Sequence, residues 1–114
     1  MLGEREICIY SYNFFNHFIL ISKTRAAPKT LDWTTDTLSK SASQCDFPGN
    51  DLSCQPSNST SDCVNSCANT VGCTHYIWFS INGGTCCVKD GIVTIYNAVS
   101  VPTTEFTSTC GIMI

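Results

Sequence analysis

Cysteine is the residue type whose number and spacing could do the most chemistry in this chain. Nine of the 114 residues are cysteine, a content typical of a disulfide scaffold in a short secreted protein. Removal of residues 1–26 would discard Cys8 and leave an even set that can pair completely. That set lies between positions 45 and 110: Cys45, Cys54, Cys63, Cys67, Cys73, Cys86, Cys87 and Cys110.

A zinc site is the main alternative use of these thiols. Cys63, Cys67, Cys73 and His75 offer three thiolates and an imidazole, which are ligands that zinc prefers. Their spacing lacks paired C-x2-C knuckles, and such a site would leave four further cysteines unexplained. We therefore expect no metal, and a cytosolic metal module remains an alternative that predicts free or metal-bound thiols.

Catalysis has few candidate residues. His17 and His75 are the only histidines, and a Cys or Ser nucleophile needs a base held by an orienting group. His75 lies within an apolar segment beside Cys73, where a packed or edge-exposed strand residue is expected. The acidic residues are scattered singly, with no pair placed for acid–base work. We expect no enzymatic activity and no cofactor.

Charge argues against two classes of partner. The formal net charge is −3, only 13% of residues are charged, and Lys89 is the only basic residue after position 40. A nucleic-acid binder needs clustered Lys and Arg to displace counterions from phosphates. We expect no nucleic-acid partner, and the same scarcity of cations disfavours anionic membrane surfaces.

Disulfides are also the expected source of stability. A domain of about 60 residues buries only about 60% of its unfolded surface, so its core alone leaves it marginal. Each native bridge adds about 2–4 kcal/mol by restricting the unfolded chain. Dependence on disulfides implies an oxidising compartment, so we expect a secreted, extracellular protein.

The first 44 residues read differently from the rest. Residues 7–21 are apolar and aromatic, but they are too short and too polar for a membrane span. Residues 1–26 are expected to be a secretory signal ending at Thr24-Arg25-Ala26, although Glu4 and Glu6 are unusual there. A wrong gene start or a remnant of upstream sequence is the alternative. Residues 27–44 are polar, and we expect a linker with Trp33 as its one apolar anchor.

Residues 45–114 are punctuated by turns and are expected to form one domain. Residues 55–61 form a polar loop containing Asn58-Ser59-Thr60, an acceptor for N-glycosylation in a secreted chain. Ser61 or Asp62 can cap a short helix that runs to about Thr70, with Gly72 just beyond its end.

Strands are expected in the second half of this domain. Residues 73–81 and 85–89 are rich in aromatic or β-branched residues and flank a tight turn at 82–84, a pattern typical of a hairpin. Residues 92–101 are a further strand candidate. The expected fold is a small disulfide-rich α+β domain with a short helix packed on an antiparallel sheet.

Aromatic residues in the first of these strands could stack on a sugar. Tyr76 and Trp78 share one face of the strand. Phe79 has the opposite parity, so it is the weak candidate for an exposed ligand contact.

The run from Cys63 to Gly91 closely resembles the PAN/apple domain family. Its helix carries Cys63-x3-Cys67, a cysteine precedes the aromatic pair Tyr76 and Trp78, and a later cysteine leads into Lys89. The resemblance extends outward over residues 45–110. It implies core positions for Tyr76 and Trp78. It also implies three bridges: Cys45–Cys110, Cys63–Cys86 and Cys67–Cys73.

Cys54 and Cys87 depart from this basic set of six. Cys87 follows Cys86 directly, and successive strand residues face opposite sides of a sheet. A fourth bridge between Cys54 and Cys87 is the simplest assignment, although eight cysteines considered without the family pattern allow 105 connectivities.

Members of the PAN/apple family mediate protein–protein or protein–carbohydrate contacts outside the cell. The leading hypothesis from this resemblance is therefore an extracellular recognition or adhesion module without catalysis. The alternative is a secreted disulfide-rich structural, effector or inhibitor protein that has no carbohydrate ligand.

Overall fold

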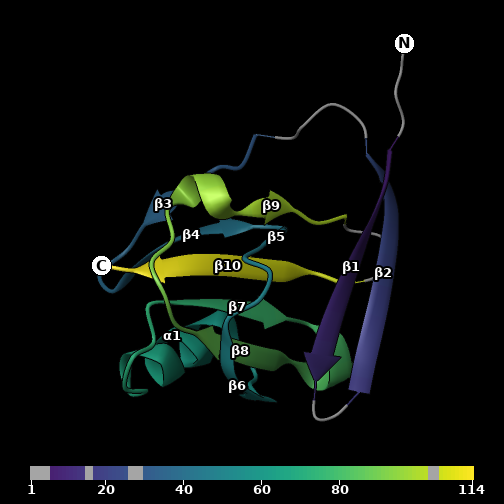
Figure 1. The fold of residues 1–114 in the computed structure, drawn as a ribbon. Helices are drawn as coiled ribbons and strands as arrows, with labels where there is room; N and C mark the ends of the chain where they lie inside the picture. Colours follow the sequence, from purple (N-terminus) through teal and green to yellow (C-terminus); the bar gives the residue numbers. More distant parts are fainter. Residues whose placement is uncertain (1–5, 15–16, 26–29, 103–105) are drawn as a thin grey trace. The chain divides into compact units, whose positions relative to one another are not determined.

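A computed structural model describes residues 6–14, 17–25, 30–102 and 106–114. The chain divides into two compact units, Met1–Thr30 and Leu31–Ile114, whose elements are labelled in Figure 1. In the first unit, β1 (Glu6–Phe14) pairs with β2 (His17–Arg25) as an antiparallel hairpin. A secretory signal was expected in this range, and Ala26 of its cleavage site lies outside the described residues.

The second unit is built on a six-stranded antiparallel sheet with the order β3-β4-β10-β7-β8-β6. β10 and β7 lie in the middle of this sheet. The last strand of the chain, β10, therefore joins the two halves of the sheet (Figure 1). A separate pair, β5 with β9, forms a two-stranded sheet. The strands are β3 (Thr34–Thr35), β4 (Ser39–Ser43), β5 (Cys45–Asp46), β6 (Asp51–Pro56), β7 (His75–Phe79), β8 (Thr85–Lys89), β9 (Val99–Ser100) and β10 (Ser108–Met113).

One α-helix, α1 (Thr60–Ala68), packs against β7, β8 and β10. The side chain of Ser59 caps it by accepting a hydrogen bond from the Asp62 amide at 3.1 Å, so the helix begins slightly before the expected Ser61 or Asp62. Cys63 and Cys67 are its buried residues. The second unit is thus a small disulfide-rich fold with one helix on an antiparallel sheet, as expected.

The turn between β7 and β8 depends on backbone conformations that glycine adopts readily. It contains the 3-10 turn η1 (Ile81–Gly83), followed by Gly84 at φ +119°. A Cβ on Gly84 would lie 1.9 Å from the carbonyl oxygen of Ser57. This close approach lets the Ser57 amide donate to the Gly84 carbonyl at 3.0 Å, which ties the loop before α1 to the hairpin.

The structure differs from the expected linker at residues 27–44. Residues 39–43 form β4, which pairs along its length with β10, and Ser39 and Ala42 are buried. The compact unit accordingly begins at Leu31 rather than at Cys45. A run of small polar residues pairs through its backbone as well as an apolar run does, and composition does not reveal this.

Residues 92–101 do not form the expected strand. They contain η2 (Ile95–Asn97) and only the short β9. The Thr94 hydroxyl accepts from the Tyr96 amide at 3.2 Å, and the Thr94 amide donates to Oδ1 of Asn97 at 2.8 Å. This reciprocal cap favours a turn over continued extended backbone.

Packing covers both faces of the sheet. On the helix face, a buried cluster consists of Cys63, Cys67, Tyr76, Cys86 and Val88. The alternate residues of β7 point the other way. There His75 contacts the ring of Phe47, with 5.1 Å between centroids, and Phe79 contacts the ring of Phe106 at 5.2 Å.

Candidate functional site

Disulfides frame the second unit. Four join its eight cysteines, as Cys45–Cys110, Cys54–Cys87, Cys63–Cys86 and Cys67–Cys73. They are the three pairs that the PAN/apple resemblance implies and the fourth pair that was expected between Cys54 and Cys87. The three cysteines considered as zinc ligands therefore have their sulfurs in disulfides.

A second group of candidate metal ligands is also explained by a bridge. One ligand atom each from Asp51, Cys54 and Cys87 lies within 4.8 Å of the others. The two sulfurs are bonded to each other, and a disulfide sulfur lacks the thiolate charge that binds metal. This group is not a ligand set.

Two bridges hold α1 against the sheet. Cys63 is bonded to Cys86 of β8, and Cys67 to Cys73 just before β7. Both helix cysteines are buried, with at most 1% of their surface exposed. Since the two sulfurs leave the same face of the helix, they fix its rotation as well as its position. The opposite face of α1 stays in solvent.

A third bridge fixes the edge of the sheet. Cys54 of β6 and Cys87 of β8 are direct partners across the antiparallel ladder. Cys86 is bonded to the helix, so its neighbour Cys87 faces the other side of the sheet. β6 is therefore held to β8 from the face away from α1, and the helix-facing side of β6 is open.

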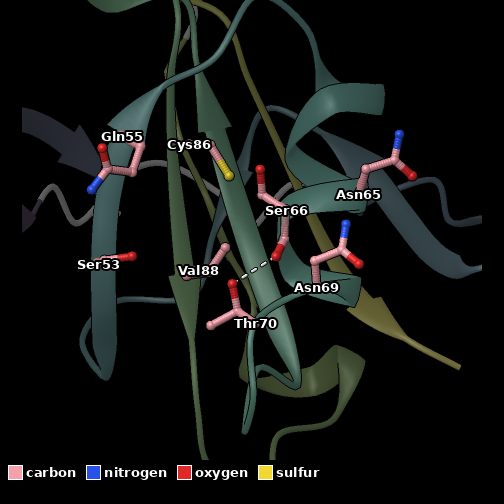
Figure 2. A pocket seen from close by; sticks show the side chains of 8 residues that line it. All are labelled: Ser53, Gln55, Asn65, Ser66, Asn69, Thr70, Cys86 and Val88. Carbon is pink, nitrogen blue, oxygen red and sulfur yellow. Dashed lines mark hydrogen bonds between the residues drawn. The ribbon is translucent and has the colours of Figure 1, made fainter.

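Between α1 and β6 lies a groove of about 360 Å³, shown in Figure 2. Its volume lies near the lower end of the range of small-molecule sites. Eight described residues line it, and none of these eight is charged. They are Ser53 and Gln55 from β6, Cys86 and Val88 from β8, and Asn65, Ser66, Asn69 and Thr70 from the end of α1 and the residues that follow it.

The groove offers hydrogen bonds without ions. Gln55, Asn65 and Asn69 carry side-chain amides, each with two N–H donors and a carbonyl acceptor, and all three are exposed. The Thr70 hydroxyl donates to the Ser66 carbonyl at 2.7 Å, so it faces a ligand as an acceptor. Such a surface suits a neutral polar ligand.

A smaller pocket of about 170 Å³ is also lined by α1 residues. Ser61, Val64 and Asn65 of the helix contribute to it. Asp36 adds a carboxylate, so this pocket is chemically different from the groove. Its other lining residues are Thr37, Leu38 and Ser39.

Lys89, the only lysine or arginine after position 40, is engaged inside the fold. It is 3% exposed, forms an ion pair with Asp51, and donates from Nζ to the Gly49 carbonyl at 2.9 Å. Asp51 begins β6, and the ladder to β8 shifts register between Asp51 and Ser53. The lysine therefore holds the irregular end of β6 in place, and its charge is internally paired. The sequence showed the residue but not this role.

His75 is packed rather than poised for proton transfer. It is 1% exposed, and burial, followed by the charge of Lys89, lowers its pKa from 6.5 to about 4. The Thr74 hydroxyl donates to the Gly91 carbonyl and lies 2.8 Å from Nδ1 of His75. Because a hydroxyl has one hydrogen to donate, Nδ1 carries the proton of the neutral ring.

The aromatic residues take other positions than a binding platform would need. The prediction that Phe79 makes an exposed ligand contact is wrong. Phe79 is 0% exposed, because the sheet is covered on both faces. Tyr76 is also buried, whereas Trp78 is half-buried and donates from Nε1 to the Ser57 carbonyl at 3.0 Å. The ring of Trp33 lies 6.4 Å from that of Phe47.

Asn58, the expected glycosylation acceptor, is exposed in the loop before α1.

The groove residues were missed by sequence reasoning. Their one local signal is the polar outer face of the helix, where Asn65 and Asn69 are one turn apart.

Across the described part of the chain, no helix has the length and apolar content required to cross a membrane. Comparisons with known proteins give no further guide. No protein-family model, no curated protein and no solved structure matches the chain.

Proposed function

We propose that residues 31–114 form an extracellular recognition module resembling the PAN/apple domain, which binds protein or carbohydrate and performs no catalysis. The observation that carries the proposal is the neutral groove between α1 and β6, with its exposed amides and hydroxyls. Three elements are fixed around it by disulfides, and a site pre-organised in this way loses little entropy when a ligand binds.

The extracellular location rests on the same bridges. Four disulfides within one small unit are typical of an oxidising compartment and rare in the cytosol. A secretory route also fits Asn58, whose exposure leaves it accessible to N-glycosylation. We propose that the mature protein is secreted and carries a glycan there.

The absence of catalysis in this proposal rests on the groove's chemistry. None of its eight described residues titrates near neutral pH, since the sulfur of Cys86 is in a disulfide. General acid–base and nucleophilic mechanisms need such a group. Binding there should depend on shape and hydrogen bonds.

The test is a screen of the full chain on carbohydrate and peptide arrays, with two matched variants of α1. Ser66→Lys places a long charged side chain in the groove, whereas Ala68→Lys adds the same charge at an exposed helix position that does not line it. Saturable binding that Ser66→Lys weakens about tenfold or more, and Ala68→Lys retains, supports the proposal. No saturable binding on either array favours a secreted structural protein without a ligand.

A further inference from the structure

We infer that the groove binds the backbone of an extended, uncharged peptide segment. This inference rests on the proposed recognition function and adds the class of ligand. The eight lining residues repeat along the groove with a spacing that matches such a segment.

The lining residues form pairs whose members follow one another along the groove. Figure 2 places Gln55 above Ser53 and Cys86 above Val88, and the helix pairs run in the same direction. Asn65 lies above Asn69, and Ser66 above Thr70. The groove therefore has two levels, each built from one member of every pair.

The strand pairs are in register with each other. Gln55 is the ladder partner of Cys86, and Ser53 is the ladder partner of Val88. Residues two apart in a strand are separated by about 6.6–6.8 Å. The spacing between the two levels along β6 and β8 is thus that of one strand repeat.

The helix supplies nearly the same spacing. Asn65 and Asn69 are four residues apart, as are Ser66 and Thr70, and four residues of α-helix rise about 6.0 Å. An extended peptide repeats every two residues over about 6.6–6.8 Å. Side chains on both walls can therefore meet successive peptide groups of one extended ligand in the same way.

The chemistry of the walls also fits a peptide backbone. A side-chain amide has the same N–H donors and carbonyl acceptor as a peptide group, so one amide can pair with both. Gln55 on one wall and Asn69 on the other are exposed and carry such groups. Figure 2 draws both amides turned outward from the groove, so each would rotate about its side-chain bonds to pair with a ligand. Val88 lies on the floor but is only 3% exposed, so the groove offers a ligand mainly polar contacts.

Two features favour a peptide over a sugar or an ion. The eight described lining residues include no aromatic ring, on which the apolar face of a sugar ring packs best. They also include no charged side chain to pair with an ionic ligand. The two levels span about three peptide residues, so affinity comes from a short segment and depends weakly on its sequence.

The experiment measures binding of the full-length chain, made without glycans, to an array of uncharged random hexapeptides. A second array presents the same peptides with N-methyl groups at alternate residues, which removes N–H donors from one edge of the extended chain. The test variant is Asn65→Ala/Asn69→Ala, at two exposed positions. The control is Asn58→Ala, also exposed but outside the groove.

We expect saturable binding of many unrelated sequences, with loss of binding on N-methylation in one of the two alternating registers. The double variant should bind about 10- to 30-fold more weakly, the effect of two lost hydrogen bonds, and Asn58→Ala should bind like the wild type. Peptide binding that survives both N-methylation and the double variant overturns the inference.

A carbohydrate array run in parallel separates this inference from the proposed function. If the chain binds glycans but no peptides, and the double variant weakens glycan binding, recognition by the groove stands and the peptide ligand is wrong. If neither array shows saturable binding, both the recognition function and the peptide inference fail.

Discussion

The two faces of the central sheet are stabilised by different means. On the helix face, Cys63 and Cys67 bond α1 down to the sheet, and the outer surface of the helix stays polar. On the far face, the Cys54–Cys87 bridge joins β6 to β8, and the other contributions come from buried rings such as Phe79 and buried polar groups such as Lys89 and His75. A short helix fixed by disulfides needs little apolar surface, so its remaining residues are free to form a groove.

The two faces also differ in the effect that acid is expected to have on them. Titratable groups are buried on the far face, while the described residues of the groove are neutral. We therefore expect acid to affect the stability of the fold through the far face and to leave the chemistry of the groove unchanged.

Removal of the bridge that closes the longest loop should lower the free energy of unfolding the most. Cys45→Ala/Cys110→Ala opens a loop with a sequence separation of 65, for which the chain-entropy model gives a loss of about 4 kcal/mol. Denaturant unfolding of the variant and the wild type measures this loss.

The matched control is Cys67→Ala/Cys73→Ala, whose separation is 6 and whose expected loss is about 2 kcal/mol. If both variants lose the same free energy, loop entropy is not the main contribution of these bridges.

Acid should destabilise the fold through His75. Its pKa is about 4 in the folded protein, against an ordinary value of 6.5, so between these pH values the unfolded chain takes up a proton that the native ring does not. Native stability is complete above pH 6.5 and falls as pH drops towards 4, by about 3 kcal/mol in total. Unfolding free energies measured from pH 7 to 4 report this slope.

His75→Gln removes the titrating ring and serves as the comparison. Its stability should change less than that of the wild type between pH 6.5 and 4.5, where carboxylates contribute little. Equal slopes in the two proteins would show that the histidine is not the acid-sensitive group.

Gly111→Ala should damage the helix face without adding pH dependence. A Cβ at Gly111 would lie 2.3–2.7 Å from atoms of the Tyr76 ring and hydroxyl, and this ring is fully buried. Overpacking of this kind costs about 1–3 kcal/mol. We expect a loss of about 2 kcal/mol that is the same at pH 7 and pH 5, measured by denaturant unfolding. A loss that grows at pH 5 would mean that the two faces are coupled.

The sequence predicted those parts of the fold whose signals are local. The helix, the β7–β8 hairpin and the cysteine spacing each depend on residues close together in the chain. β4 was missed because Ser39–Ser43 has no apolar alternation and pairs through its backbone with β10, far along the sequence. Phe79 was misplaced because strand parity shows which residues share a face, but not whether another layer covers that face.

The groove was beyond prediction for a related reason. Its residues come from β6, β8 and α1 with the residues after it, and their polar side chains look like ordinary surface in each segment alone. Only the register of Ser53 and Gln55 against β8, together with the helix fixed above them, places them around one space.

The smallest expected effect is on stability, and it comes from the groove itself. Asn65→Ala/Asn69→Ala changes two exposed side chains, and the cap at Asn69 uses its backbone N–H, which alanine keeps. Surface changes of this kind stay within about 0.5 kcal/mol, so unfolding curves should nearly superimpose. A loss above about 1 kcal/mol would mean that these amides stabilise the fold rather than bind a ligand. The outer side of α1 would then not be free for binding.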